Sequence, residues 1–206
     1  MPVSTRRRSA HDRLLEAAAD LFYAEGYGVS VEAIAEHAGV AKPTVYAHFA
    51  SKEALIEAVL RSSSDGYFAD LDDELERRAG DPEAQLTAPF DLLVKGLPDP
   101  SYHGCICVNS AATFPAPTHP AHRVLKAHEE RMLEIFERLA GGAGAAHPAE
   151  LARRLLLLYD GVKTRGLVDF SGAAADDARA AAMALLNTER HLASIGARRP
   201  STPNLT

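Results

Sequence analysis

Apolar residues recur every three or four positions along most of this chain, a spacing typical of amphipathic helices. In the first such stretch, Gly26 follows directly after the pattern and is expected to end the helix, so we predict a helix over 10–25. Alternating β-branched runs are nearly absent and alanine is abundant, so the pattern predicts an all-α protein. The apolar stripe of this first helix consists of Leu14, Leu15, Ala18, Leu21 and Phe22.

Glycine, proline and capping residues divide the rest of the chain. Ser51 is expected to cap a long helix that Gly66 can interrupt, and Pro89 to kink or restart the helix that begins at Pro82. We also expect a loop at 97–100 and a disordered tail. The further predicted helices cover residues 31–38, 42–49, 52–78, 104–114, 119–140, 148–170 and 174–195.

The stretch 30–55 carries the most informative pattern. Two short predicted helices flank Gly39, which can adopt the positive φ of a tight turn. This is the arrangement of a helix-turn-helix, whose second helix enters the DNA major groove. Lys52 lies in the first turn of the next helix, where a cation opposes the helix dipole, so we interpret it as present for a partner. The second helix is too short to need its polar side chains for stability: Lys42, Thr44, Tyr46 and His48.

These residues resemble the N-terminal DNA-binding domain of the TetR family of bacterial transcriptional regulators. Ala41 departs from the pattern, because the family usually has a capping serine there, and losing the cap costs about 1 kcal/mol. The resemblance implies a helix-turn-helix DNA-binding domain over 1–50 and a helical effector-binding and dimerisation domain over 51–197, with a tail over 198–206. The matching positions are Ala18, Leu21, Phe22, Gly26, Tyr27, Ile34-Ala35, Ala38-Gly39-Val40, Thr44-Val45-Tyr46, His48-Phe49 and Ser51-Lys52-Glu53-Ala54-Leu55.

The resemblance also implies roles in DNA recognition. Side chains at the start of the second helix would contact base edges, and others would bind backbone phosphates and fix the register. For Tyr46, packing against the first helix is the alternative, and the basic arm at 6–8 with Arg13 either reaches DNA or is merely solvated. The expected base contacts are Lys42, Pro43 and Thr44, and the expected phosphate contacts are Ser30, Tyr46, His48 and Lys52.

The C-terminal part is expected to bind an effector and a second copy of the chain. Its leucine run at 155–158 makes a helix apolar on all sides, which must be covered on all sides. Asp160 lies in the middle of this helix and needs a partner such as Lys163, His103 or a ligand. The expected dimer residues, with burial inside a single chain as the alternative, are Leu155, Leu158, Leu185 and Leu192. Expected to line a largely apolar effector cavity, or else to form plain core, are Phe68, Phe90, Val94, Val108, Phe114, Met132, Tyr159 and Asp160.

Composition and charge change this picture little. Apolar residues make up 47% of the chain and charged residues 24%, as in soluble globular proteins. No apolar run approaches the roughly 20 residues that cross a bilayer, so we expect a soluble cytoplasmic protein with no membrane partner. The net charge of −6 argues against indiscriminate nucleic-acid binding. Residues 1–52 are neutral in sum, however, and the rest carries the acidic excess.

Cys105 and Cys107 are the two cysteines of the chain, and their spacing fits no standard zinc pattern. We expect reduced thiols, at least one of them buried. No nucleophile elbow, paired carboxylates or phosphate-binding glycine loop appears, so we expect no enzyme, cofactor or metal. The sequence therefore favours a homodimeric, effector-released regulator, most often a repressor, on a palindromic operator. A thiol-based redox-sensing regulator, and a carrier or enzyme that uses the helical cavity, stay open as alternatives.

Overall fold

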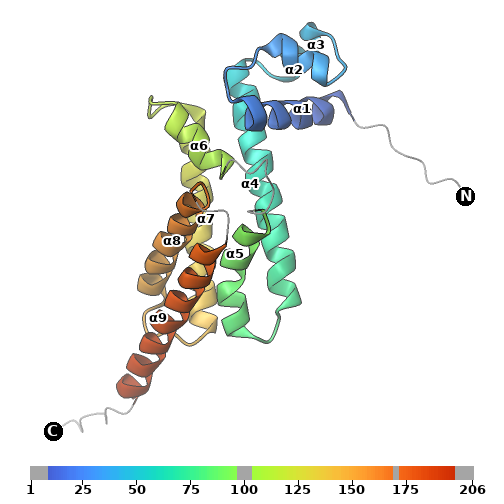
Figure 1. Ribbon diagram of the computed structural model, residues 1–206. Helices are drawn as coiled ribbons and strands as arrows, with labels where there is room; N and C mark the ends of the chain where they lie inside the picture. The colour runs from blue at the N-terminus through green and yellow to red at the C-terminus, as the bar shows by residue number, and fades with distance from the viewer. Residues whose placement is uncertain (1–8, 97–103, 169–171, 198–206) are drawn as a thin grey trace, which may run out of the picture. The chain divides into compact units, whose positions relative to one another are not determined.

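The computed structural model describes residues 9–96, 104–168 and 172–197, which form helices and no strand, and this confirms the all-α prediction (Figure 1). The basic arm at 6–8, the predicted loop at 97–100, His103 and the tail lie outside these residues. None of the described helices is both long and apolar enough to span a bilayer. The helices are α1 (Ala10–Glu25), α2 (Val31–His37), α3 (Lys42–His48), α4 (Lys52–Arg77), α5 (Pro82–Gly96), α6 (Ile106–Thr113), α7 (Pro120–Gly142), α8 (Pro148–Arg165) and α9 (Ala173–Ala197).

Short polar side chains begin the helices where the sequence predicted them to. The Oγ atoms of Ser30 and Ser51 each accept a hydrogen bond from the backbone N–H three residues ahead, at 3.1 Å. Ala41 precedes α3 and makes no side-chain cap, as expected for an alanine. Each serine thus satisfies one of the N–H groups that a helix start leaves unpaired.

Three expectations about helix continuity are wrong. α4 runs through Gly66, which is exposed and where an added Cβ would meet nothing within 4 Å, so the glycine lowers helix propensity without disturbing any packing. α5 continues through Pro89 and does not restart there, because burial of Pro89 and of Phe90 offsets the hydrogen bond that proline cannot donate, and a kink at Pro89 stays a prediction. α8 ends at Arg165, since the N–H of Gly166 bonds the Val162 carbonyl at 2.8 Å and closes the last turn.

The chain forms two compact units. The first comprises residues up to Tyr67 together with Cys105–His128, and the second comprises Phe68–Gly104 together with everything from Glu129 onward. The helices α4 and α7 therefore each begin in the first unit and end in the second. The predicted boundary at residue 50 separates a DNA-binding domain from an effector-binding and dimerisation domain, and it stays a prediction.

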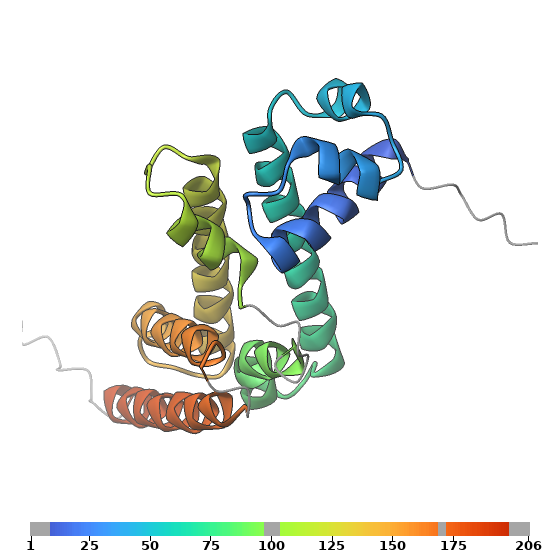
Figure 2. The same ribbon diagram turned by 45° about the horizontal axis from the view of Figure 1, so that its top comes forward.

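The first unit holds α1, α2 and α3 on the beginning of α4 (Figure 2). Its apolar core also includes α6 and the beginning of α7. Cys107, Ala121 and Val124 are at most 2% exposed and belong to the same cluster as Leu14 and Ile34. Residues as far apart in the sequence as Leu14 and Cys107 thus share one core. Burial of these apolar side chains, at about 25 cal/mol per Å², stabilises both together.

The second unit is built around aromatic side chains from three helices. The ring centroids of Phe90, Phe136 and Tyr159 lie 5.9 to 6.4 Å apart, and all three side chains are at most 1% exposed. The α9 helix packs on both α8 and α5. Small residues on α9 permit this close approach, because Ala175, Ala178 and Ala182 are buried there.

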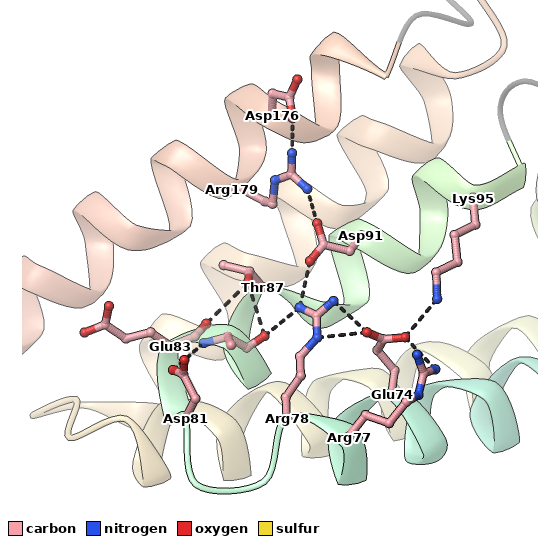
Figure 3. A network of polar contacts seen from close by, with 11 residues as sticks. Glu74, Arg77, Arg78, Asp81, Glu83, Thr87, Asp91, Lys95, Asp176 and Arg179 are labelled. Carbon is pink, nitrogen blue, oxygen red and sulfur yellow. Dashed lines mark hydrogen bonds and ion pairs between the residues drawn. The ribbon is translucent and has the colours of Figure 1, made fainter.

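A network of ion pairs crosses this second unit (Figure 3). The Glu74 carboxylate, only 7% exposed, is contacted by Arg77 at 2.6 Å, Arg78 at 2.7 Å and Lys95 at 2.8 Å. The Lys95 and Arg78 hydrogen bonds lower the pKa of Glu74 to about 2. Arg78 also contacts Asp91, which in turn pairs with an arginine of α9. The network therefore joins α4, α5 and α9.

We expect Glu74→Gln to lower the thermal unfolding midpoint by several degrees at pH 7, because it leaves three cations without their shared anion. A carboxylate with a depressed pKa adds stability above its unfolded pKa and loses it as the pH falls through its folded pKa. The difference from the wild type should thus be constant above about pH 5 and shrink toward pH 2. Denaturant unfolding followed by circular dichroism measures it. Glu76→Gln, at an exposed site of α4, is the control, and an equal loss there would contradict the assignment.

Candidate nucleic-acid interface

The α3 helix has one buried face and one exposed face. Val45 is 2% exposed and Phe49, at its C-terminal end, 6%, so both anchor the helix to the core of the first unit. Tyr46, by contrast, is 50% exposed. A helix of two turns is unstable alone, and these two anchors hold it in place. The remaining exposed side chains of α3 are Lys42, Pro43, Ala47 and His48.

The turn between α2 and α3 fixes the angle at which α3 is presented. Gly39 has φ +63°, a conformation that side-chain-bearing residues rarely adopt. Its N–H bonds the Glu36 carbonyl, and the N–H of Val40 bonds the Ala35 carbonyl, each at 3.0 Å. These bonds close the C-terminal end of α2 and direct the chain into α3. The predicted helix-turn-helix geometry is therefore present.

Lys42, the first residue of α3, pairs with Glu32 in the first turn of α2. The ammonium of Lys42 lowers the pKa of Glu32, and the carboxylate raises the pKa of Lys42. Both side chains are about half exposed. The lysine expected to read base edges is thus held by an intramolecular partner that the sequence reading did not identify.

Lys52 makes a hydrogen bond within the chain that the sequence did not predict. Its Nζ donates to the carbonyl oxygen of Tyr27 at 2.6 Å and lies partly buried. Lys52 therefore has a structural role that its interpretation as a cation present for a partner did not include. An ammonium has three protons, however, and one carbonyl uses one of them. Binding of a phosphate by Lys52 stays a prediction, and the residue also fastens the start of α4 to the loop after α1.

The other predicted DNA contacts lie around α3 and α2. Ser30 is exposed, and its Oγ caps α2 as an acceptor, which leaves the hydroxyl proton to donate. Thr44 is partly buried, and Pro43 and His48 are exposed. His48 lies edge-on to the ring of His11, with centroids 5.8 Å apart. The sequence reading gave His11 no role.

Tyr27 connects the helix-turn-helix to α6. Its hydroxyl donates to the Ile106 carbonyl at 3.3 Å, and burial raises its pKa to about 12. Its ring lies 5.2 Å from the rings of both Phe22 and Phe114. One residue of the loop after α1 thereby contacts α6, its following loop and, through its carbonyl, the start of α4.

The predicted effector residues fall in both units. Val108 and Phe114 belong to the first unit, where Phe114 stacks on His119 at 3.8 Å. Asp160 has found the partner expected for it, since Lys163 approaches its carboxylate at 2.8 Å. Whether an effector touches any of these residues stays a prediction. Those in the second unit are Phe68, Phe90, Val94, Met132, Tyr159 and Asp160.

The predicted dimer residues need one correction. Leu155 is fully buried within its own chain, so it is not available to a second copy. Successive helical residues turn by about 100°, so the leucine run places its members on different sides, and Leu157 is the one left 73% exposed. Leu158 and Leu185 are partly buried and Leu192 is 43% exposed. Leu157 lines an open groove of about 430 Å³ between α8 and α9 with small residues of both helices.

Taken together, the turn geometry and the exposed polar face of α3 define a helix-turn-helix DNA-binding protein. Sequence comparison agrees with this class. Residues 14–59 match the family described as bacterial regulatory proteins, tetR family. The crystal structure of a TetR transcriptional regulator from Streptomyces avermitilis is 30% identical, with a TM-score of 0.76 over 88% of this chain and 98% of that one. The chain belongs to the TetR family of transcriptional regulators, which are not enzymes.

Two curated relatives match over shorter stretches. The regulatory protein RaaS of Mycobacterium tuberculosis is 50% identical over 50 residues, which span 24% of each chain. The transcriptional repressor ComR of Escherichia coli is 29% identical over 143 residues, which span 66% of this chain and 68% of ComR. The identity is thus highest over a stretch of the length of a DNA-binding domain.

We expect Glu32→Gln to raise affinity for duplex DNA of arbitrary sequence about threefold, because it removes a carboxylate beside Lys42 and releases that cation toward phosphates. Fluorescence anisotropy at low salt measures it. Glu36→Gln removes the same charge from an exposed site of the same helix and should have a smaller effect. A loss of affinity in Glu32→Gln would show instead that Glu32 orients Lys42 for binding.

Proposed function

We propose that this protein acts as a homodimeric repressor that binds a palindromic operator and releases it when a largely apolar small molecule binds. The observation that carries the proposal is α3, a two-turn helix anchored by Val45 and Phe49 with its polar face outward. Such a helix can lie in a major groove with little rearrangement. The relative ComR is a transcriptional repressor, and this supports repression as the mode of regulation.

In this proposal, base and phosphate contacts have separate roles. Lys42, Pro43 and Thr44 contact base edges from the start of α3, and Tyr46, His48, Lys52 and Ser30 bind phosphates. The half-exposed ring of Tyr46 favours DNA contact over packing on α1.

The groove between α8 and α9 supports the homodimer. Leu157 is 73% exposed beside small residues of α9, and Leu192 and Ile195 are also exposed on that helix. A second copy can cover them with the same surface, as an isologous two-fold interface requires. The α8 and α9 helices of the two copies then form a four-helix bundle. Two copies of α3 related by a two-fold axis then read a palindrome.

Effector release needs a connection between the helical domain and the DNA-binding helices. The first unit supplies contacts of this kind, because α6 and the start of α7 share a core with α1, α2 and α3. An effector that shifts α6 changes the Tyr27 contacts and thereby the start of α4. Only differential affinity for the two states can drive such release. Cys107 is 2% exposed and gives the alternative of thiol sensing little support, so that alternative would rest on Cys105, which is only partly buried.

Selection from a randomised duplex pool should enrich one palindromic sequence, and this sequence serves as operator. We then expect Tyr46→Phe to weaken binding to operator and to arbitrary duplex alike, about tenfold, because a hydrogen bond to a charged phosphate is lost. Thr44→Ala should instead change the preferred sequence when the selection is repeated. Enrichment of a site without two-fold symmetry, or an unchanged preference in Thr44→Ala, would contradict the docking.

We expect Leu157→Glu to convert the dimer to monomer at micromolar concentration, since it buries a charge in an apolar interface without a partner. Analytical ultracentrifugation measures the mass, and operator affinity should fall with it. Ala69→Glu adds the same charge at an exposed site of α4 and should leave the dimer intact. A Leu157→Glu protein that remains dimeric would place the interface elsewhere.

A further inference from the structure

Two histidines lie together where the first turn of α1 meets the last turn of α3. The His11 ring stacks on the Phe49 ring, with centroids 5.1 Å apart and an interplanar angle of 29°. The His48 ring lies edge-on to the His11 ring, with centroids 5.8 Å apart and an angle of 75°. Phe49 is 6% exposed, so it fixes the position of His11. His48 is exposed, and the His11 side chain is 45% exposed. Both rings can therefore meet a ligand that approaches α3.

Within the described residues, Asp12, the sequence neighbour of His11, is the charged group in contact with this pair. From α1, the Asp12 carboxylate lies 3.6 Å from Nδ1 of His11, and from α3 each ring faces the other. The hydrogen bond from Ser9 lowers the pKa of Asp12, so this carboxylate stays ionised beside the His11 ring. Two imidazolium rings this close repel each other, however. An anion that binds both removes this repulsion.

A DNA phosphate is such an anion. His11 lies in the first turn of α1, where the free N–H groups and the dipole of the helix attract a phosphate. His48 lies in the last turn of α3, where the dipole favours a cation. Imidazole is the side chain that changes charge between about pH 5 and 8, and a neutral ring gains a proton when a phosphate binds it. Phosphate binding at this pair is thus coupled to proton uptake.

We propose that His11 is a further DNA-contacting residue, which holds one backbone phosphate together with His48, and that this contact makes DNA affinity rise as the pH falls. The inference rests on the proposed function of α3. It adds a residue and a proton dependence that the helix-turn-helix pattern does not specify. Base reading is unaffected, because a phosphate contact carries no sequence information.

The test uses the full-length protein and a fluorescein-labelled duplex of arbitrary sequence about three helical turns long. Fluorescence anisotropy at constant ionic strength gives the affinity from about pH 8 to about pH 6. Wild-type affinity should rise about tenfold or more, as expected for the uptake of about one proton per DNA-binding head. The double variant His11→Asn/His48→Asn should show no such rise, and His11→Asn alone about half of it on a logarithmic scale.

Two substitutions separate charge from structure. His11→Phe keeps a ring to stack on Phe49 but carries no charge, so it should also lose its share of the pH dependence. His11→Arg supplies a permanent cation and should give, at pH 8, an affinity close to that of the wild type at the low end of the range. His37→Asn, on the same unit at an exposed histidine 3.9 Å from Asp20, should leave the pH dependence unchanged. Thermal melting confirms that each variant is folded.

The outcomes separate this inference from the proposed function. If the wild-type protein binds the duplex with an affinity independent of pH, or if His11→Phe keeps the full dependence, the histidine contact is wrong and DNA binding stands. If the protein retains no duplex at any pH, the proposed function itself fails. If His37→Asn also removes the pH dependence of DNA affinity, the protons are taken up elsewhere in the first unit and the inference is overturned.

Discussion

The burial of Val45 and Phe49 is the interaction on which the DNA-binding surface depends. The α3 helix has only seven residues and no side-chain cap at Ala41, so little local energy keeps it helical. Its two apolar anchors fix both its position and its rotation about its axis. Because the anchors lie four residues apart, they share one face, and the polar side chains necessarily point away from it.

This dependence explains how far the sequence was informative. Spacing of apolar residues, capping serines and Gly39 are local features, and from them the helices α1, α2 and α3 and their turn could be predicted closely. The partners of Lys42 and Lys52 could not, because Glu32 lies ten positions away and the Tyr27 carbonyl twenty-five, and no local pattern records such contacts. For the same reason the four consecutive leucines indicated an apolar helix but not which of them, Leu157, remains exposed.

The first unit also shows that the DNA-binding helices do not form a core of their own. Cys107, Ala121 and Val124 come from α6 and α7 and are buried in the same cluster as α1 and α2. Removing their contacts would expose apolar surface of α1 and α2, which costs free energy in proportion to the exposed area. A displacement of α6 would therefore disturb the core that it shares with α1 and α2. Tyr27 is placed to transmit such a displacement, because its hydroxyl bonds to α6 and its carbonyl accepts a bond from Lys52 at the start of α4.

The charges around the helix-turn-helix favour sequence-selective DNA binding over tight binding to any duplex. Phosphate contacts by free cations raise affinity for every duplex, so a head with many unpaired lysines binds arbitrary DNA tightly. Here Lys42 is paired with Glu32, and Lys52 donates one hydrogen bond to a backbone carbonyl. In the proposed docking, this pairing would weaken binding to arbitrary DNA, whereas base contacts to a correct sequence would offset the rearrangement of Lys42. Because competing genomic sites outnumber the operator, the ratio of the two affinities matters more than either one.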